Sequence, residues 1–248
     1  MSVILNHPGH SSQKSHGRKG SLTEAEFDAL PTGQGAIDAL PGTYDQVLRR
    51  TADQRGGIGT RERLQVQDAI DGEHGYARDG YIETNRTLYR DKGDLTNATP
   101  EVRQQVERID RLMEMSKLDR DVAVHRGTSE PGRVIPGFDP NGSNVGKTWT
   151  HHAFQSTSAR FQIAEEFARG HNASSQHRSS ENHPTELRIH VPAGTRAVQI
   201  TGMDRYEGEG DGGGYAEVLL DRGLGMRVVN DHGVVDGIHF LDVEVTGG

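Results

Sequence analysis

Apolar residues in the first half of the chain recur at intervals of three and four positions, the spacing of one face of an α-helix. The clearest set follows Pro100, which suits the first turn of a helix because an N–H there would have no partner within the helix. This set predicts a helix over residues 100–113 and consists of Val102, Val106, Ile109, Leu112 and Met113. Two smaller sets predict earlier helices, one with Leu64, Ala69 and Ile70, the other with Ile82, Leu88 and Tyr89.

After Lys117 the pattern changes to short apolar or alternating runs separated by Gly, Asp, Asn or Pro, which is typical of β-strands. The predicted strands are residues 122–125, 148–156, 186–191, 197–200, 216–220, 226–229 and 238–245. One helix is predicted among them, over residues 161–169, with Phe161, Ala164, Phe167 and Ala168 on its apolar face. Helices first and strands afterwards predict an α+β fold, in which N-terminal helices precede a mixed or antiparallel β-sheet core.

The chain divides into three parts by composition. Residues 1–20 contain three basic residues and no acidic one, and they are predicted to form a flexible basic arm. Residues 21–59 are predicted as a polar helical or linker segment, whose first helix begins with a capping box between Ser21 and Glu24. Residues 60–248 are predicted to form the main folded domain.

Composition excludes several kinds of site and partner. The chain has no cysteine, so disulfides, thiolate metal sites and a cysteine nucleophile are ruled out. Its apolar runs are short, so we expect no membrane span and no signal peptide. The net charge of −8 disfavours binding to nucleic acid by bulk electrostatics. We expect no metal site, because the three histidines of the basic arm have no carboxylate beside them.

Three polar side chains stand at the ends of predicted strands in the second half. Arg126 ends the strand that begins at residue 122, Ser156 ends the strand containing Phe154, and Glu217 precedes Val218. Each has an ordinary structural explanation. An Arg at a strand end reaches solvent, a Ser before a helix serves as its cap, and a Glu in a strand faces water.

The order and context of these three residues resemble a known family. The segments that carry the resemblance are VHRGT at 124–128, FQSTS at 154–158 and GYAEVLLDRG at 214–223, with GYIETNRTLYR at 80–90 upstream. Together they resemble the R-S-E class, the clostridial-toxin-like branch of NAD-dependent ADP-ribosyltransferases. The resemblance covers residues 60–248 and implies a catalytic domain with the ADP-ribosyltransferase type of sheet. The wording of residues 1–20 is similar to segments of actinobacterial phage structural proteins, which suggests a phage-encoded protein.

The resemblance implies a mono-ADP-ribosyltransferase that cleaves NAD between nicotinamide and ribose, with NAD as substrate and no metal. Glu217, Ser156 and Arg126 would be catalytic. Glu217 would supply negative charge to stabilise the positively charged transition state, and Ser156 would orient the Glu217 side chain. Arg126 would also bind the NAD phosphates, because a guanidinium forks onto phosphate oxygens. The other expected NAD-binding residues are Gly127, Ser156, Thr157, Ser158 and Arg178. Ser156 would orient either Glu217 or the nicotinamide ribose, and Gly127 would let the backbone approach nicotinamide closely.

One departure from the family pattern concerns the acceptor. Family members that modify arginine carry a Glu two residues before the catalytic one, and this chain has Tyr215 there. We therefore expect an acceptor other than arginine, recognised by Tyr215 and by Tyr206, Glu207 or Glu209 of the preceding loop. Either of the two acids could instead replace the missing carboxylate.

The expected acceptor is a host protein, met in the host cytoplasm, and the basic arm could associate the protein with a phage virion. Two alternatives stay open. The protein could be an NAD glycohydrolase, in which water replaces the acceptor, or a phage virion-associated protein that uses the fold as an interaction module.

Overall fold

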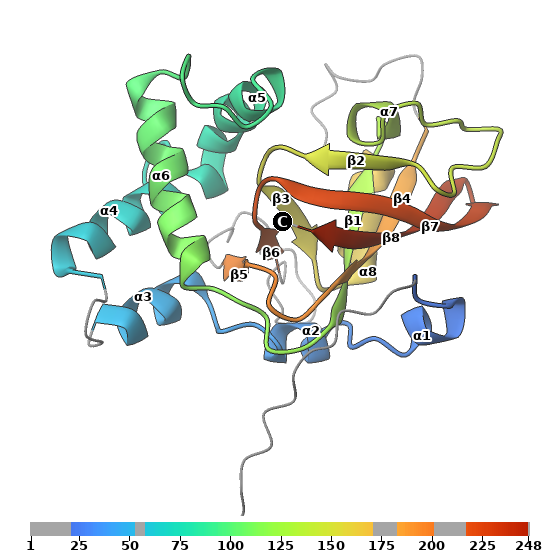
Figure 1. The fold of residues 1–248 in the computed structure, drawn as a ribbon, viewed down its shortest axis with the longest axis horizontal. Coiled ribbons are helices and arrows are strands. Elements are labelled where there is room, and N and C mark those ends of the chain that lie inside the picture. Colours follow the sequence, from blue (N-terminus) through green and yellow to red (C-terminus); the bar gives the residue numbers. More distant parts are fainter. Residues whose placement is uncertain (1–20, 53–57, 171–182, 201–216, 248) are drawn as a thin grey trace, which may run out of the picture.

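The computed structural model describes residues 21–52, 58–170, 183–200 and 217–247. Figure 1 shows a group of helices on one side and a curved sheet on the other. The helices that precede the sheet are α1 (Glu24–Asp28), α2 (Gln34–Asp38), α3 (Tyr44–Ala52), α4 (Thr60–Asp71), the π-helix η1 (Tyr76–Gly80), α5 (Tyr81–Arg90) and α6 (Pro100–Glu114). The predicted α+β order is confirmed.

Helix α6 forms as its sequence predicts. The Thr99 side chain accepts a hydrogen bond from the Val102 N–H at 3.3 Å, and Pro100 occupies the first turn. All five predicted apolar residues of this helix are buried. Their burial against α4 and the sheet supplies the stabilisation that a single isolated helix lacks in water.

The two earlier helices bury other residues than the sequence analysis predicted. Leu64 is 57% exposed, and Ile82 is 49% exposed. Helix α4 instead buries Val66 with Ala69 and Ile70, and α5 buries Thr84 and Thr87 with Leu88. Both buried sets have the spacing i, i+3, i+4, which keeps them on one face, whereas Leu64 and Ile82 lie off that face.

The predicted capping box is displaced by two residues. Thr23, not Ser21, caps α1: its side chain accepts from the Glu26 N–H at 3.3 Å, and the Glu26 carboxylate accepts from the Thr23 N–H at 2.9 Å. Ser21 and Glu24 have the same capping-box spacing as Thr23 and Glu26. The helix begins at Glu24, however, and this start places Phe27 in the interior.

The sheet has eight strands in the order β2-β7-β8-β4-β1-β3-β6-β5. Its strands are β1 (Val122–Thr128), β2 (Thr148–His151), β3 (Gln155–Ser158), β4 (Thr185–Val191), β5 (Ala197–Ile200), β6 (Glu217–Leu220), β7 (Leu224–Val235) and β8 (Ile238–Gly247). Helix α7 (Pro131–Val134) follows β1, and α8 (Phe161–Ala168) follows β3. Neighbouring strands run antiparallel, except β4 and β8, which run parallel. The prediction of a mixed sheet is therefore confirmed.

The run 148–156, predicted as one strand, forms two. Strand β2 pairs with β7 at one end of the strand order, whereas β3 pairs with β1 and β6 in the other half. Between them the chain buries Ala153 and Phe154. The local pattern is strand-like throughout, so only the pairing partners reveal the break.

Two hydrophobic clusters hold the sheet and the helices together. The first contains residues of β1, β4, β7 and β8 together with Val218 and Leu220 of β6, and the second joins β5 and Leu219 of β6 to helices α3–α6. Residues from the segment 21–59 enter both, Ala36 and Leu40 the first, Val47 and Leu48 the second. The described residues of this segment thus pack into the same folded body as the described residues after position 59.

Helix α8 crosses β1 directly over Gly127. A Cβ atom added at Gly127 would lie 1.8 Å from the carbonyl oxygen of Ala164 and 2.5 Å from the amide nitrogen of Ala168. Both atoms belong to backbone, which cannot move aside as a flexible side chain would. The close packing of α8 on β1 therefore requires glycine at this position.

We expect Gly127→Ala to lower the free energy of unfolding by about 1–3 kcal/mol or more, because it forces α8 away from β1. Urea unfolding monitored by circular dichroism measures the change. Gly132→Ala is the matched control, since no heavy atom lies within 4 Å of the added Cβ, and its effect is expected within about 0.5 kcal/mol. Equal effects of the two substitutions would contradict this account of the contact.

Candidate active site

Arg126, Ser156 and Glu217 lie close together on three neighbouring strands of the sheet. They belong to β1, β3 and β6, which are adjacent in the strand order. The Arg126 Nη1 donates to the Ser156 carbonyl oxygen at 2.6 Å, and the Ser156 side chain hydrogen-bonds the Glu217 carboxylate. Arg126 and Ser156 lie within β1 and β3 rather than at the strand ends expected from the sequence, and only Glu217 stands at the end of its strand. One serine thus contacts both a guanidinium and a carboxylate.

Both charged groups keep a buried polar atom without a protein partner. Among the described residues, neither Arg126 Nε nor Glu217 Oε2 has a hydrogen-bond partner, and both atoms are buried. Burial raises the pKa of Glu217, while the hydrogen bond from Ser156 and the charge of Arg126 act in the opposite direction. Unsatisfied buried atoms are costly to a folded protein and are typical of a place that receives a ligand.

Thr157 and Ser158 make contacts that fix the strand. The Thr157 hydroxyl donates to the Val218 carbonyl oxygen at 2.6 Å, which ties β3 to β6. Ser158 Oγ accepts from the Arg160 N–H at 2.9 Å in the turn that leads into α8. These bonds set the position of Ser156 and Glu217 relative to α8.

The structure adds a buried tyrosine that the sequence analysis did not single out. The Tyr76 hydroxyl accepts from Asn85 Nδ2 at 3.0 Å and lies within the electrostatic influence of Glu217 and Arg126. Burial raises its pKa, so it stays protonated near neutral pH. Tyr76 lies just before the segment 80–90 that carried part of the family resemblance, which was the available signal.

His151 and Tyr89 form a second polar pair near Arg126. The Tyr89 hydroxyl lies 2.8 Å from His151 Nε2. Burial, reinforced by the charge of Arg126, lowers the pKa of His151 to about 3. His151 is therefore neutral near pH 7 and adds no second positive charge beside Arg126. This pairing could not be predicted from local sequence patterns, because the two residues are 62 positions apart.

Gly127 is needed for a different reason from the one expected. The sequence analysis attributed the glycine to a close approach of the backbone to a ligand. In the structure, the direction in which a Cβ would point is filled by α8. The absence of a side chain thus serves the packing of α8, and binding by the Gly127 backbone stays a prediction.

Five predicted residues lie outside the described residues. They are Arg178 of the expected NAD-binding set and the expected acceptor residues Tyr206, Glu207, Glu209 and Tyr215.

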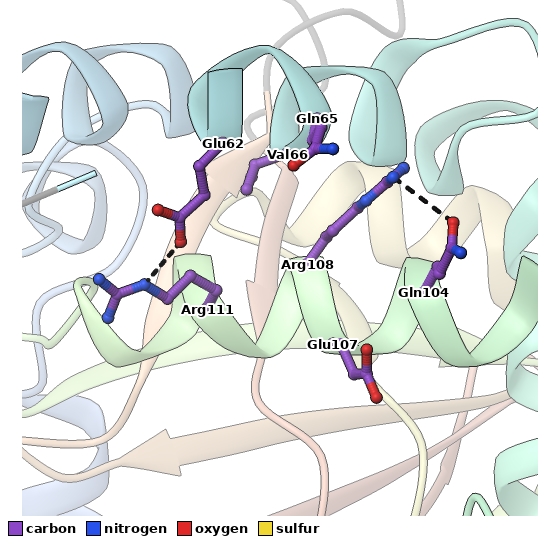
Figure 2. Close-up of a pocket in the computed structure, with 7 residues that line it drawn as sticks. All are labelled: Glu62, Gln65, Val66, Gln104, Glu107, Arg108 and Arg111. Carbon is purple, nitrogen blue, oxygen red and sulfur yellow. Dashed lines mark hydrogen bonds and ion pairs between the residues drawn. The ribbon is translucent and has the colours of Figure 1, made fainter. Parts of the chain in front are cut away.

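A separate hollow between α4 and α6 does not qualify as a site. Figure 2 shows its charged side chains already engaged: Arg111 Nε lies 3.1 Å from Glu62, and Arg108 reaches Gln104. Glu107 points away from the hollow in the same view. We therefore assign no ligand to it.

In the part of the chain that the structure describes, no group of three or more His, Cys, Asp or Glu side chains is placed to hold a metal ion. Within the same residues, no helix combines the length and the apolar composition that crossing a bilayer requires.

A family model described as ADP-ribosyltransferase exoenzyme matches residues 67–239 of this chain, well over half of its length. A search of curated proteins finds no match.

Several solved structures have the same fold. C3stau2 from S. aureus, solved with NAD, has a TM-score of 0.53 and 16% identity, covering 83% of this chain and 93% of that one. The C3 exoenzyme of Clostridium limosum has a TM-score of 0.52 and 16% identity, covering 83% and 95%. The ADP-ribosyltransferase Vis, in complex with an inhibitor, has a TM-score of 0.54 and 19% identity, covering 93% and 88%.

The buried carboxylate has a consequence for stability. Its raised pKa means that the folded protein holds the Glu217 proton more tightly than the unfolded chain, so ionising Glu217 destabilises the fold. We expect Glu217→Gln to raise the free energy of unfolding at pH 7. The difference in the free energy of unfolding between Glu217→Gln and wild type should shrink as the pH falls toward 4.5, the ordinary pKa of the side chain.

Urea unfolding of both proteins between pH 4 and pH 8 measures this difference. Glu107→Gln is the control, because this exposed side chain on α6 points away from its neighbours and belongs to no ion pair among the described residues. A Glu217→Gln protein that is less stable than wild type at pH 7 would show that the carboxylate is not the strained group described here.

Proposed function

This chain belongs to the ADP-ribosyltransferase exoenzyme family, and we propose that it transfers ADP-ribose from NAD to a protein acceptor other than arginine. The observation that carries the proposal is the meeting of Arg126, Ser156 and Glu217, with one buried polar atom unused on each charged residue. The family and its structural neighbours are NAD-dependent ADP-ribosyltransferases.

The unpartnered atoms suit two kinds of group that NAD presents, its phosphate oxygens and its ribose hydroxyls. Arg126 offers N–H groups that can donate to phosphate oxygens, with Nη1 anchored on the Ser156 carbonyl oxygen so that the guanidinium is held in place. Glu217 Oε2 has no hydrogen-bond partner among the described residues and can accept from a ribose hydroxyl. Thr157, Ser158, Gly127 and Arg178 complete the proposed NAD-binding set.

In the proposed reaction the bond between ribose C1′ and the nicotinamide nitrogen breaks, and its electron pair leaves with nicotinamide, which becomes neutral. A bond forms between C1′ and the acceptor nucleophile, which releases a proton. Positive charge develops on the ribose as the first bond lengthens. The Glu217 carboxylate, oriented by Ser156, stabilises that charge from a fixed position, at no cost of reorganisation.

The acceptor is proposed from the sequence. Tyr215 stands where arginine-modifying family members carry a Glu, and a phenol cannot act as a carboxylate base near neutral pH. We assign acceptor recognition to Tyr215, Tyr206, Glu207 and Glu209. The net charge of −8 favours a protein over a nucleic acid. A role for residues 1–20 in a phage particle, with a place in the virion or the host cytoplasm, stays a prediction.

The central test is release of nicotinamide from NAD by the purified protein, with and without a host-cell lysate. We expect release that depends on the lysate and falls by about 10²–10³-fold in Glu217→Gln, because a fixed charge that stabilises the transition state is removed. Glu107→Gln is the matched carboxylate control and should retain wild-type rates.

Other outcomes point to other activities. Release without lysate that is equally lost in Glu217→Gln would identify an NAD glycohydrolase. A folded protein that neither binds NAD nor releases nicotinamide would overturn the proposal in favour of an interaction module.

The acceptor proposal has its own test. Wild-type protein incubated with labelled NAD and agmatine, a free-arginine analogue, is expected to leave agmatine unmodified while it labels lysate protein. Tyr215→Glu restores the carboxylate and is expected to raise agmatine modification above the wild-type level. Robust modification of agmatine by the wild-type protein would refute the assignment of a non-arginine acceptor.

A further inference from the structure

The sheet has a second polar face, separate from the proposed NAD site. Cross-strand pairs place His125 opposite Arg188, and Arg188 opposite Asp242, so these side chains share one face of β1, β4 and β8. Glu186, opposite Phe240, lies on the same face. The other face of these strands buries the first hydrophobic cluster. Ionisable groups on a half-covered face are unusual and invite a search for what they bind.

A cavity of about 380 Å³ opens on this face, bounded by α1 and α8. Four carboxylates, one guanidinium and two histidines line it, together with apolar side chains. The single guanidinium, Arg188, is already paired with two carboxylates: it bonds Asp242 at 2.7 and 3.0 Å and Asp28 at 2.5 Å. The cavity therefore has an excess of negative charge and offers little to an anion.

Glu186 is the carboxylate without a full set of partners. It is 1% exposed, and its Oε1 lies 2.9 Å from His125 Nδ1. Its Oε2 is buried and has no hydrogen-bond partner among the described residues. Burial raises the pKa of Glu186 by more than the hydrogen bond with His125 and the charge of Arg188 lower it, and the charge of Glu165 on α8 adds to the rise. A cation beside Oε2 would favour the ionised carboxylate and so oppose this rise.

Apolar groups stand at the mouth of the same cavity. The rings of Phe161 and Phe240 stack at 6.1 Å with an interplanar angle of 13°. Phe161 is 39% exposed, and Val235 is 52% exposed. A ligand that reaches Glu186 past these side chains must therefore carry apolar surface next to its charge.

We propose that this cavity binds an organic cation, a guanidinium or primary ammonium group on a short apolar stem. Glu186 Oε2 receives the charged group, and Phe161, Phe240 and Val235 contact the stem. Aromatic faces add a favourable interaction with a guanidinium. A metal ion is disfavoured, because no group of three ligating side chains converges among the described residues.

The proposed cation site is distinct from the NAD site. His125 and Arg126 are neighbours in β1, and successive side chains of a strand leave opposite faces. His125 lines the cavity, whereas Arg126 bonds the Ser156 carbonyl oxygen. Binding to the cavity therefore needs neither NAD nor turnover, and its test does not depend on the proposed activity.

The test titrates the full-length protein with n-butylguanidinium and follows backbone amide shifts by NMR. A ligand of this size is expected to bind with a Kd of ~1 mM. The neutral isostere n-butylurea should not bind. Glu186→Gln should weaken binding about tenfold to a hundredfold, the effect of losing a charged hydrogen-bond partner. Equal binding of the urea, or unchanged binding in Glu186→Gln, would overturn the proposal.

Glu244→Gln is the matched control. Glu244 lies on the same face, opposite His190, and its Oε2 also lacks a partner among the described residues, but it does not line the cavity. This variant should bind the probe as the wild type does.

A surface variant tests the site without altering buried residues. Val235→Lys places a tethered ammonium at the mouth and should reduce n-butylguanidinium binding at least tenfold. Val234→Lys, 62% exposed in the wild type and outside the lining, should not. Equal binding by the two lysine variants would place the probe elsewhere and refute the site.

One more probe, an acetylated and amidated Gly-Arg-Gly peptide, tells whether the ligand is an arginine side chain of a partner protein or a small free cation. Binding tighter than that of n-butylguanidinium would support an arginine side chain of a partner protein as the ligand. Binding weaker than that, with the Glu186→Gln effect intact, would support a small free cation.

Discussion

The hydrogen bond from Arg126 to the Ser156 carbonyl oxygen depends on β3 lying between β1 and β6, and the whole candidate site depends on that bond. Through it the serine holds a guanidinium by its backbone and a carboxylate by its side chain. Neither charge could be buried alone without a large loss of hydration energy. The Thr157 hydroxyl fixes the same strand to β6, so the distance between the two charges is set by sheet geometry and not by flexible side chains.

This arrangement is not optimised for stability. Burial raises the pKa of Glu217, and each of the two charged residues has a buried atom without a partner in the part of the chain that the structure describes. A sequence selected for stability alone would replace such a pair with apolar residues of similar volume. Groups that are held rigidly and left unsatisfied are instead expected where ligand binding and catalysis are selected at the expense of stability. The neutral His151 fits this view, because a charged imidazole would oppose Arg126.

The sequence predicts the parts of the fold that local chemistry controls. Helix α6 and strand β5 follow from periodicity and capping, and the order of Arg126, Ser156 and Glu217 indicates the family. The split between β2 and β3 could not be predicted, because it depends on pairing with β7 and β6, distant in the sequence. The Tyr89–His151 pair and the packing of α8 on Gly127 could not be predicted for the same reason. Each contact joins segments whose local sequence patterns are independent.

Strand β1 connects the candidate active site with the proposed cation site. Within three consecutive residues it directs Arg126 toward Ser156, His125 toward Glu186, and the bare backbone of Gly127 toward α8. Helix α8 also carries Phe161, whose ring packs edge-on against His125 at 5.9 Å. A cation in the cavity would therefore contact side chains that pack against the strand holding Arg126. Any influence of that cation on NAD binding would have to pass through β1. A coupling between two sites requires a structural element whose conformation is affected by both of them.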